Sequence, residues 1–499
     1  MNKRDMHFPV WLRLLAVGGL LAGMADVRAG DELPYPEDPL GAHQSLTASP
    51  GRSAMTPGSD PCSIDGPKPA KWTLVDVIEQ ALCHNPQTRQ AWANAKAQAS
   101  QLGMAESAYL PSVNFNVPLS RSKNSAGGSF NSSIPVPGST DNKAENTRIA
   151  PALSVNYLLL DFGGRAARVE LARQTLEVAN WTHASVLQNV LFAAIQAYFQ
   201  MFAANAALEA AEATEKNSKG ALDVAVGRYE VGTAALADKL QAQTVYSQAR
   251  VSRQTAAGNA RVALGVLANS MGLKPSDAIQ FESPRLEGPD MERERDVQEL
   301  IEQAKNSRPD LAAAEAQVRA SEAGILSARS NSLPTLSLVG NYSWYEQFGA
   351  VSVPSWMVGV QFSVPLFTGF NNTYQIRNAE EQVESQAAAR DQLEKSVELA
   401  VWQAYYTLQA IRENLRNTEE LLKSAQQSEE VALGRYREGV GTIVELLNTV
   451  SNLANARYQF VQAHYNWRIG KAQLVQALGR LDLDDVRAVE GSRGILNAN

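Results

Sequence analysis

Two long stretches of the chain contain no proline, and this absence constrains the fold more than any other feature. No proline lies between Pro151 and Pro275, and none follows Pro365. Both stretches are rich in Ala, Gln, Glu, Leu and Arg, which favour helices, whereas an internal proline would break helical hydrogen bonds. The sequence therefore predicts two very long helices, at about 165–229 and 371–436, each roughly 100 Å long.

Each predicted long helix ends at a glycine turn and is followed by a shorter helix. The turns are Tyr229-Glu230-Val231-Gly232 and Tyr436-Arg437-Glu438-Gly439. Glycine ends helices because it adopts the left-handed conformation without a steric penalty. Return helices are predicted at about 234–271 and 442–480, and leading helices at about 86–109 and 309–332. A return helix and a leading helix together nearly match one long helix, so they could stack end to end beside it.

The chain reads as a duplication with two similar halves, 72–275 and 296–480. Matching pairs of segments recur in the same order: Asn85-Pro86 to Val113 with Arg308-Pro309 to Leu336, Gln196-Ala197-Tyr198-Phe199 with Gln403-Ala404-Tyr405-Tyr406, Gly227-Arg228-Tyr229 with Gly434-Arg435-Tyr436, Ala249-Arg250 with Ala456-Arg457, and Met271-Gly272 with Leu478-Gly479. A repeat of about 200 residues is too long for a solenoid unit. Between and after the halves we expect a linker, 276–295, and a C-terminal tail, 481–499.

Four short segments alternate apolar residues with polar or small ones, which is typical of strands with two different faces. They are Ser112–Ser120, Pro151–Leu159, Thr335–Trp344 and Ser355–Leu366. Each has the length and pattern of a transmembrane strand, about 9–11 residues with lipid on one side and water on the other. The Ser/Asn/Gly-rich stretch 121–148 and the shorter stretch 346–354 are expected to be exposed loops. A soluble β-sandwich would show the same alternation.

Four strands cannot enclose a pore, and an open sheet edge cannot face lipid. The sequence therefore predicts an oligomer, and three chains would supply twelve strands and a ring of helices. The expected fold class is mainly α with a transmembrane β part. For the helices alone, an ordinary coiled-coil rod is the alternative.

The N-terminus has the features of an export signal. Lys3 and Arg4 precede an apolar run, Leu14–Met24, and small residues end at Ala29, so residues 1–29 are predicted to be removed. The apolar run is too short to span a bilayer. Residues 30–71, rich in Pro, Gly and Ser, are expected to be an irregular leader.

The chain has two cysteines, Cys62 and Cys83. Export to an oxidising compartment favours a disulfide between them, which would close a loop of about 20 residues. Two buried thiols are the alternative.

Composition and motifs exclude several classes of function. The net charge of -7 gives no support for a nucleic-acid partner. The sequence contains no HExxH, no phosphate-binding P-loop and no G-x-S-x-G. Asp161-Phe162-Gly163 spells a kinase motif, but the other kinase segments are missing. We therefore expect no enzyme, no metal site and no cofactor.

Several segments together resemble the TolC-type family of outer-membrane efflux and secretion channels. They are Leu158-Leu159-Leu160-Asp161-Phe162-Gly163-Gly164-Arg165, Arg228-Tyr229-x-x-Gly232, and Arg435-Tyr436-x-x-Gly439 followed by Thr442-Ile443-Val444-Glu445-Leu446-Leu447. The resemblance implies a homotrimer with a 12-stranded barrel in outer-membrane lipid and a 12-helix tunnel through the periplasm. It also implies two partners, a periplasmic membrane-fusion adaptor and an inner-membrane pump of the ABC or RND type.

The resemblance also assigns roles to residues near the glycine turns. The pore constriction would involve Asp238, Tyr436, Glu445 and Asn448. Gly441 stands where the family carries a basic residue that helps to lock the closed tip. A threefold axis would turn Glu445 into a ring of three carboxylates that favours cations. Solvated helix surface is the alternative for Glu445 and Asp238.

The turns themselves match the family's tips that contact the adaptor. These residues are Val231, Gly232, Thr233, Gly439 and Val440. Plain helix–helix turns would use the same glycines, and both interpretations can hold together.

Two questions about function stay open at the level of sequence. The cargo could be small toxic molecules or an unfolded protein; the segment Leu82–Arg89 looks like that of type I secretion channels, including the one for adenylate-cyclase toxin. A periplasmic adaptor or coiled-coil structural protein of the envelope is the alternative function. It would need a lipoyl-like or small β-barrel domain and no lipid-facing strands.

Overall fold

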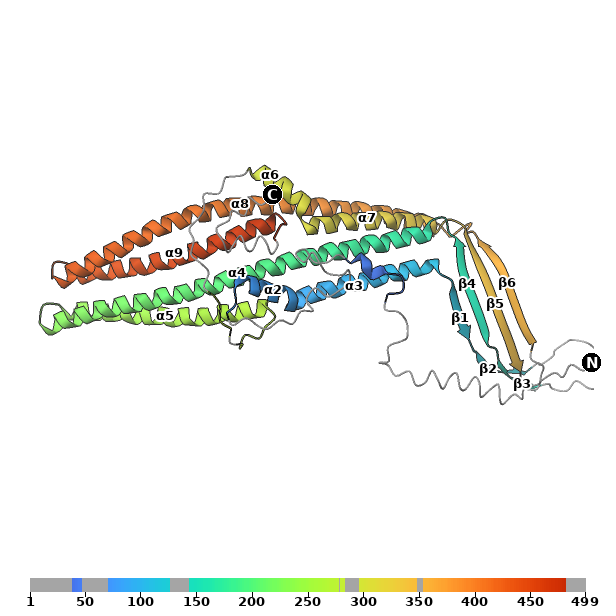
Figure 1. The fold of residues 1–499 in the computed structure, drawn as a ribbon, viewed down its shortest axis with the longest axis horizontal. Helices are drawn as coiled ribbons and strands as arrows, with labels where there is room; N and C mark the ends of the chain where they lie inside the picture. Colours follow the sequence, from blue (N-terminus) through green and yellow to red (C-terminus); the bar gives the residue numbers. More distant parts are fainter. Residues whose placement is uncertain are drawn as a thin grey trace, which may run out of the picture.

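The computed structural model describes residues 38–46, 71–125, 143–277, 279–282, 296–347 and 353–481. The predicted signal peptide, Cys62, most of the leader and nearly all of the tail lie outside these residues. The described chain forms a long bundle of helices with a narrow sheet at one end (Figure 1).

Two helices run the length of the bundle: α4 (Gly164–Glu230) and α8 (Asn371–Arg437), of 67 residues each. A helix of that size is about 100 Å long. Their ends lie within one residue of the predicted ends. Among the described helices, only α4 contains an 18-residue window apolar enough to cross a membrane, and 56% of that window is buried inside the chain. Packing against other helices therefore accounts for its apolar residues.

The return helices and the leading helices meet end to end. The return helices are α5 (Leu236–Ser270) and α9 (Ile443–Ala477), and the leading helices are α3 (Pro86–Glu106) and α7 (Pro309–Ser330). Asn85, which caps α3, donates through Nδ2 to the Ser270 carbonyl at 3.1 Å. Arg308 donates through Nη1 to the Ala477 carbonyl at 3.1 Å. Figure 1 shows α5 in line with α3 beside α4, and α9 in line with α7 beside α8.

Two short helices precede the leading helices and were not expected as separate elements. They are α2 (Leu74–His84) and α6 (Val297–Ser307), each of 11 residues. A residue before proline is disfavoured in the helical conformation, so the chain turns at Asn85 and at Arg308, each followed by a proline. The apolar faces of α2 and α6 are buried against α4 and α8. Cys83, in α2, is disulfide-bonded, and its pairing with Cys62 stays a prediction.

Parts of the expected leader and linker are ordered. The 3-10 helix η1 (Ala42–Ser45) packs on α3 and α4, where Leu46 is buried. Trp72 forms a parallel bridge with Phe281, inside the segment expected to be a linker. The second short 3-10 helix, η2 (Ser107–Tyr109), follows α3 and leads into the sheet.

The sheet has six strands, which form four columns. The strands are β1 (Ser112–Asn116), β2 (Leu119–Ser125), β3 (Lys143–Ile149), β4 (Ala152–Leu160), β5 (Thr335–Gln347) and β6 (Val353–Ser363). β1 pairs with β4, β4 with β5, and β5 with β6; β2 pairs with β3, which also meets the end of β5. All of these pairs are antiparallel. Within the described residues, β6 has a partner on one side only.

The predicted strand Ser112–Ser120 and the predicted loop 121–148 were partly wrong. The strand is interrupted at Pro118, which has no N–H for a ladder bond, and Pro151 interrupts the neighbouring column at the same level. There the Ala150 N–H donates to the Pro118 carbonyl at 3.0 Å. Beyond the break, β2 and β3 continue the ladder into the expected loop. The second predicted loop, 346–354, is also entered by strands. β5 reaches Gln347 and β6 begins at Val353, so the loop is shorter than expected.

The register places the apolar residues of four strands on one face. Directly opposed residues share a face, and opposed pairs include Val113 with Val155, Phe115 with Leu153, Leu153 with Tyr342, Tyr157 with Leu338, Leu338 with Val360, and Leu336 with Phe362. The other face carries Ser, Asn and Gln, with Leu158, Val339 and Met357 as its larger apolar residues. The apolar face is open: Val360 is 61% exposed and Phe362 is 65% exposed.

The joints between strands and long helices share one backbone shape. Each joint has two consecutive left-handed residues: Phe162 and Gly163 before α4, and Gly369 and Phe370 before α8. At the first joint Arg165 is buried and donates to the carbonyls of Leu158 at 2.7 Å and Leu159 at 3.2 Å. Asp161 accepts from the Arg165 backbone N–H, so the kinase-like triplet is part of a structural turn.

The junction between α9 and α7 generates a prediction about stability. Gly479 has a φ of 73°, and a Cβ there would lie 2.7 Å from the Arg308 Cα. Gly479→Ala should lower the free energy of unfolding by about 1–3 kcal/mol, because strain and a backbone clash act together. Thermal unfolding of the purified protein, followed by circular dichroism, would measure the change.

The matched control is Gly324→Ala, in the interior of α7, where a Cβ meets nothing within 4 Å. It should leave stability unchanged or raise it by up to about 1 kcal/mol, because alanine favours helices. Equal destabilisation by both substitutions would contradict a tight end-to-end junction.

Candidate functional site

The predicted site residues gather at the two helix turns, at the end of the bundle opposite the sheet (Figure 1). Gly232 and Gly439 end α4 and α8 with φ values of 80° and 81°. In each turn a backbone N–H returns to the helix: Thr233 donates to the Arg228 carbonyl at 2.8 Å and Val440 to the Arg435 carbonyl at 3.0 Å. These are left-handed helix ends of the kind that glycine permits.

The expected adaptor-contacting residues lie on the outside of these turns. Val231 is 74% exposed and Val440 is 71% exposed, and Gly232, Thr233 and Gly439 are exposed as well. Two exposed valines at adjacent tips can contact an apolar partner. The geometry therefore leaves these residues available for contact, and whether they contact an adaptor stays a prediction.

One arginine joins the two hairpins. Arg228, near the end of α4, donates through Nη1 to the carbonyl of Tyr436, near the end of α8, at 2.6 Å. Its guanidinium carbon also lies 4.9 Å from the centre of the Tyr436 ring. A helix C-terminus and an aromatic face each stabilise a nearby cation, and the Arg228 guanidinium is close to both. Sequence reasoning gave Arg228 no role, although the Arg-Tyr pair recurs in both turns and was a signal for it.

Tyr436 is the buried centre of this contact, with 2% of its surface exposed. It packs in an apolar cluster built from α4, α5, α8 and α9, which includes Leu222, Leu446 and Val450. Burial raises the pKa of the Tyr436 hydroxyl, the nearby Asp238 carboxylate raises that pKa further, and Arg228 lowers it. The hydroxyl makes no hydrogen bond within the described chain. Asp238 therefore acts on Tyr436 through its charge.

Glu445 lies in the first turn of α9, and its charge is partly offset by an arginine. Thr442 caps the helix by accepting from the Glu445 N–H at 3.2 Å, which places the carboxylate in the first turn, where the helix dipole favours it. Arg435 Nη1 lies 3.4 Å from Glu445 Oε1, and both side chains are about half exposed. Such exposed pairs contribute little to stability but do offset local charge. Asn448 is exposed one turn further along the same helix.

Gly441 lies in a tight part of the second turn. A Cβ at Gly441 would lie 3.0 Å from the Tyr436 nitrogen and 3.1 Å from the Arg435 Cβ. The turn is therefore too tight to accept a long side chain there without movement. The positive charge near Glu445 comes instead from Arg435, on the other helix of the same hairpin.

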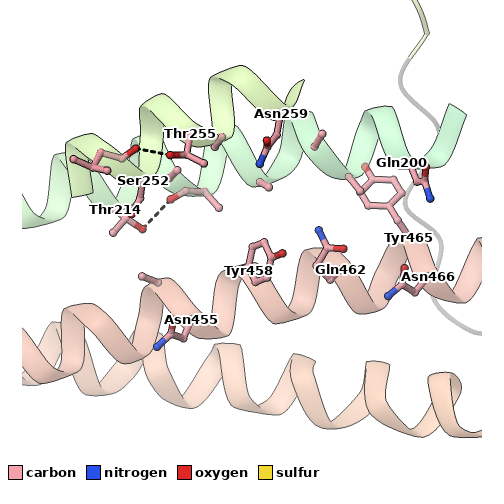
Figure 2. Close-up of a pocket in the computed structure, with 18 of the residues that line it drawn as sticks. Gln200, Thr214, Ser252, Thr255, Asn259, Asn455, Tyr458, Gln462, Tyr465 and Asn466 are labelled. Atoms are coloured by element: carbon pink, nitrogen blue, oxygen red, sulfur yellow. Dashed lines mark hydrogen bonds between the residues drawn. The ribbon is translucent and has the colours of Figure 1, made fainter. Parts of the chain in front are cut away.

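Away from the helix turns, a hollow lies between α4, α5 and α9. Its volume is about 590 Å³, and its walls are alanines and neutral polar side chains, among them Gln200, Asn455, Tyr458 and Asn466 (Figure 2). The Thr214 and Thr255 hydroxyls donate to backbone carbonyls of their own helices. No charged side chain lines the hollow, and no group of metal-binding side chains occurs in the described part of the chain.

Comparison with known proteins agrees with this architecture. The sequence model of the family described as "Outer membrane efflux protein" matches residues 77–273 and 300–480. The chain is 29% identical to Protein CyaE of Bordetella pertussis over 84% of this chain and 87% of that protein. It is 23% identical to Outer membrane protein TolC of Escherichia coli over 84% of each chain.

Solved structures show the same fold. The outer membrane protein VceC of Vibrio cholerae superposes with a TM-score of 0.68 at 20% identity, over 81% of this chain and 96% of that one. The CmeC outer membrane channel of Campylobacter jejuni superposes with a TM-score of 0.70 at 18% identity, over 84% of this chain and 89% of that one.

The family match covers both halves of the chain, and the family's members are transport conduits of the outer membrane rather than enzymes. Like them, this protein is an outer-membrane export channel that extends into the periplasm. The chain belongs to the outer membrane efflux protein family.

Proposed function

We propose that three copies of this chain form a passive conduit across the outer membrane and the periplasm. The observation that carries the proposal is the sheet, in which four strand columns share one apolar and one polar face while its edges lack partners among the described residues. Twelve columns closed into a barrel would place the apolar face in lipid and the polar face around water. Closure would also satisfy the edge hydrogen bonds, which lipid cannot.

The helices would continue this conduit as a twelve-column tunnel. Each chain contributes four columns: α4, α8, α5 with α3, and α9 with α7. Their length of about 100 Å suits a wall that crosses a compartment. The matching helix lengths in the two halves, 67 and 35 residues in each, support their origin by duplication. The sheet disfavours the alternative that the chain is a periplasmic adaptor.

The turns would form the periplasmic gate and the docking end. Asp238, Glu445 and Asn448 would line the constriction, the buried Tyr436 would support it from behind, and Arg228 would hold the two hairpins of each chain together in the closed state. Val231, Gly232, Thr233, Gly439 and Val440 would contact a periplasmic membrane-fusion adaptor. That adaptor would connect the channel to an inner-membrane pump of the ABC or RND type, giving a tripartite export system.

The cargo we favour is a polypeptide exported by type I secretion. Two observations support this choice: the resemblance of Leu82–Arg89 to type I channels, and the 29% identity to Protein CyaE over most of both chains. Efflux of small molecules is the alternative. A deletion strain that retains its cargo protein while keeping normal drug tolerance would support secretion, and the reverse phenotype would support efflux.

The lipid-facing register can be tested with two adjacent residues. Val360→Arg should prevent assembly, because an arginine on the lipid face costs about 2–4 kcal/mol per chain near the membrane centre. Gln361→Arg, on the opposite face, should assemble normally. Heat-resistant trimers on a gel, and channels in planar bilayers, would distinguish the two variants. The same yield of trimers from both would reject this register.

Glu445 and Arg435 should set the ion preference of the pore with opposite signs. Glu445→Gln should weaken cation preference, because it removes a carboxylate from each chain at a narrow level. Arg435→Gln should strengthen that preference, because it leaves the same carboxylate uncompensated. The reversal potential of single channels in a potassium chloride gradient measures both changes. If neither variant shifts it, the constriction lies elsewhere.

Arg228→Met should open the tip. The substitution keeps a long side chain but removes the donor to the Tyr436 carbonyl and the cation over its ring, so conductance should rise. Lys239→Met is the matched control, because the contact of Lys239 with the Tyr229 ring stays within a single hairpin. A conductance that is unchanged in Arg228→Met, or raised equally in both, would remove Arg228 from the gate.

A further inference from the structure

The hollow between α4, α5 and α9 is lined by amides and hydroxyls but by no charged side chain. Its volume is about 590 Å³, which is within the usual size range of ligand sites. Asp, Glu, Lys and Arg make up 19% of the chain, so a wall of this area without any of them is a local departure. Figure 2 shows Asn259 of α5 and Gln462 of α9 on opposite sides of the space.

The amides of the hollow have no partner within the described chain. Elsewhere in the bundle such groups are used for packing; for example, Gln188 donates through Nε2 to the Gly479 carbonyl at 2.8 Å. The side chains of Asn259, Asn455 and Gln462 make no hydrogen bond to any described residue. Each of these amides therefore keeps a donor group and an acceptor for a molecule in the hollow.

The floor of the hollow is built from small residues of α4. Five alanines form it: Ala203, Ala204, Ala207, Ala210 and Ala211. The alignment of Gln196 with Gln403 gives their counterparts in α8, which include Ile411, Asn414 and Asn417. A long helix of this bundle can therefore carry larger side chains at these positions. Alanine here leaves space for the backbone of another molecule to lie close to α4.

The hollow lies on the face of α5 and α9 that carries residues of the proposed constriction. Residues seven apart return to the same face of helices packed as coiled coils. On α9 this spacing leads from Asn448 to Asn455 and Gln462, and on α5 three such steps lead from Asp238 to Asn259. Because Asp238 and Asn448 are proposed to line the pore, the hollow opens into the same pore. It begins about 10 Å along α9 from Asn448.

We propose that the hollow holds an extended, uncharged segment of the exported polypeptide inside the pore. This inference rests on the proposed conduit and its polypeptide cargo. From Asn455 to Asn466 the hollow is about 16 Å long, which matches about five residues of extended chain. The free amides donate to the carbonyls of that chain and accept from its N–H groups. Every peptide has these groups, so the hollow binds the backbone of the cargo and is indifferent to its sequence.

Cysteine modification tests where the hollow opens. Gln462→Cys trimers in a planar bilayer should lose part of their conductance when a bulky maleimide is added on the side of the sheet, because the label occupies the pore. The protein without the introduced cysteine is the control, and its conductance should not change. A labelled Gln462→Cys channel with unchanged conductance would place the hollow outside the pore and overturn the inference.

Blockade of single channels by a peptide tests the ligand. The probe is a peptide of about 20 Gly, Ser and Asn residues, long enough to span the hollow several times over. Added on the side of the sheet, it reaches the hollow without passing the tip and should block the current transiently. Gln462→Leu combined with Asn259→Leu should shorten the mean blockade about tenfold, because two hydrogen bonds of ordinary strength are lost.

Two controls make this result specific. Gln254→Leu combined with Asn452→Leu changes the same residue types on the same two helices, but outside the hollow, and should leave the blockade time unchanged. The same peptide with an N-methylated backbone has no N–H groups and should block only briefly in every variant. Long blockades by the methylated peptide would contradict recognition of the backbone.

The outcomes separate this inference from the proposed function. If channels form but the hollow variant and the unmodified protein show equal blockade times, the inference is wrong and the conduit stands. If the purified protein forms no channels in bilayers, the proposed function itself fails.

Discussion

The unsatisfied backbone along the edges of the sheet is the constraint on which the architecture depends. A strand in lipid has no water to accept or donate its hydrogen bonds, so every edge must find another strand. In this chain the described sheet is four columns wide, with β1 and β2 at one edge and β6 at the other. Copies of the chain can meet this requirement together. The arrangement of the helices then follows from that of the strands, because each column of the sheet is joined to a helix and sets the direction of that helix.

Much of the helical part could be predicted because the residues that begin and end helices act locally. Proline and glycine positions placed the ends of α4 and α8 within one residue. The short helices α2 and α6 were missed because they abut the leading helices, with only the residue before a proline between them. The polar strands β2 and β3 were read as loop because Ser, Asn and Lys show no apolar alternation there. Backbone pairing joins these strands, and such pairing leaves little trace in the sequence.

The candidate site could be predicted only in part, for a related reason. Tyr436, Asp238 and Glu445 were proposed from the resemblance, which carries positions but not partners, and their role in a constriction stays a prediction. Arg228 was missed because its contact with Tyr436 spans 208 residues of sequence. Arg435 was missed because its contact with Glu445 depends on how the second hairpin folds.

The end-to-end junctions give the four columns of each chain different mechanical properties. α4 and α8 are continuous, so they resist both stretching and compression along their whole length. The other two columns are each built from two helices that meet through a few polar contacts at Asn85 and Arg308, so they resist pushing far better than pulling. A load along the bundle is therefore borne unequally by the continuous and the interrupted columns.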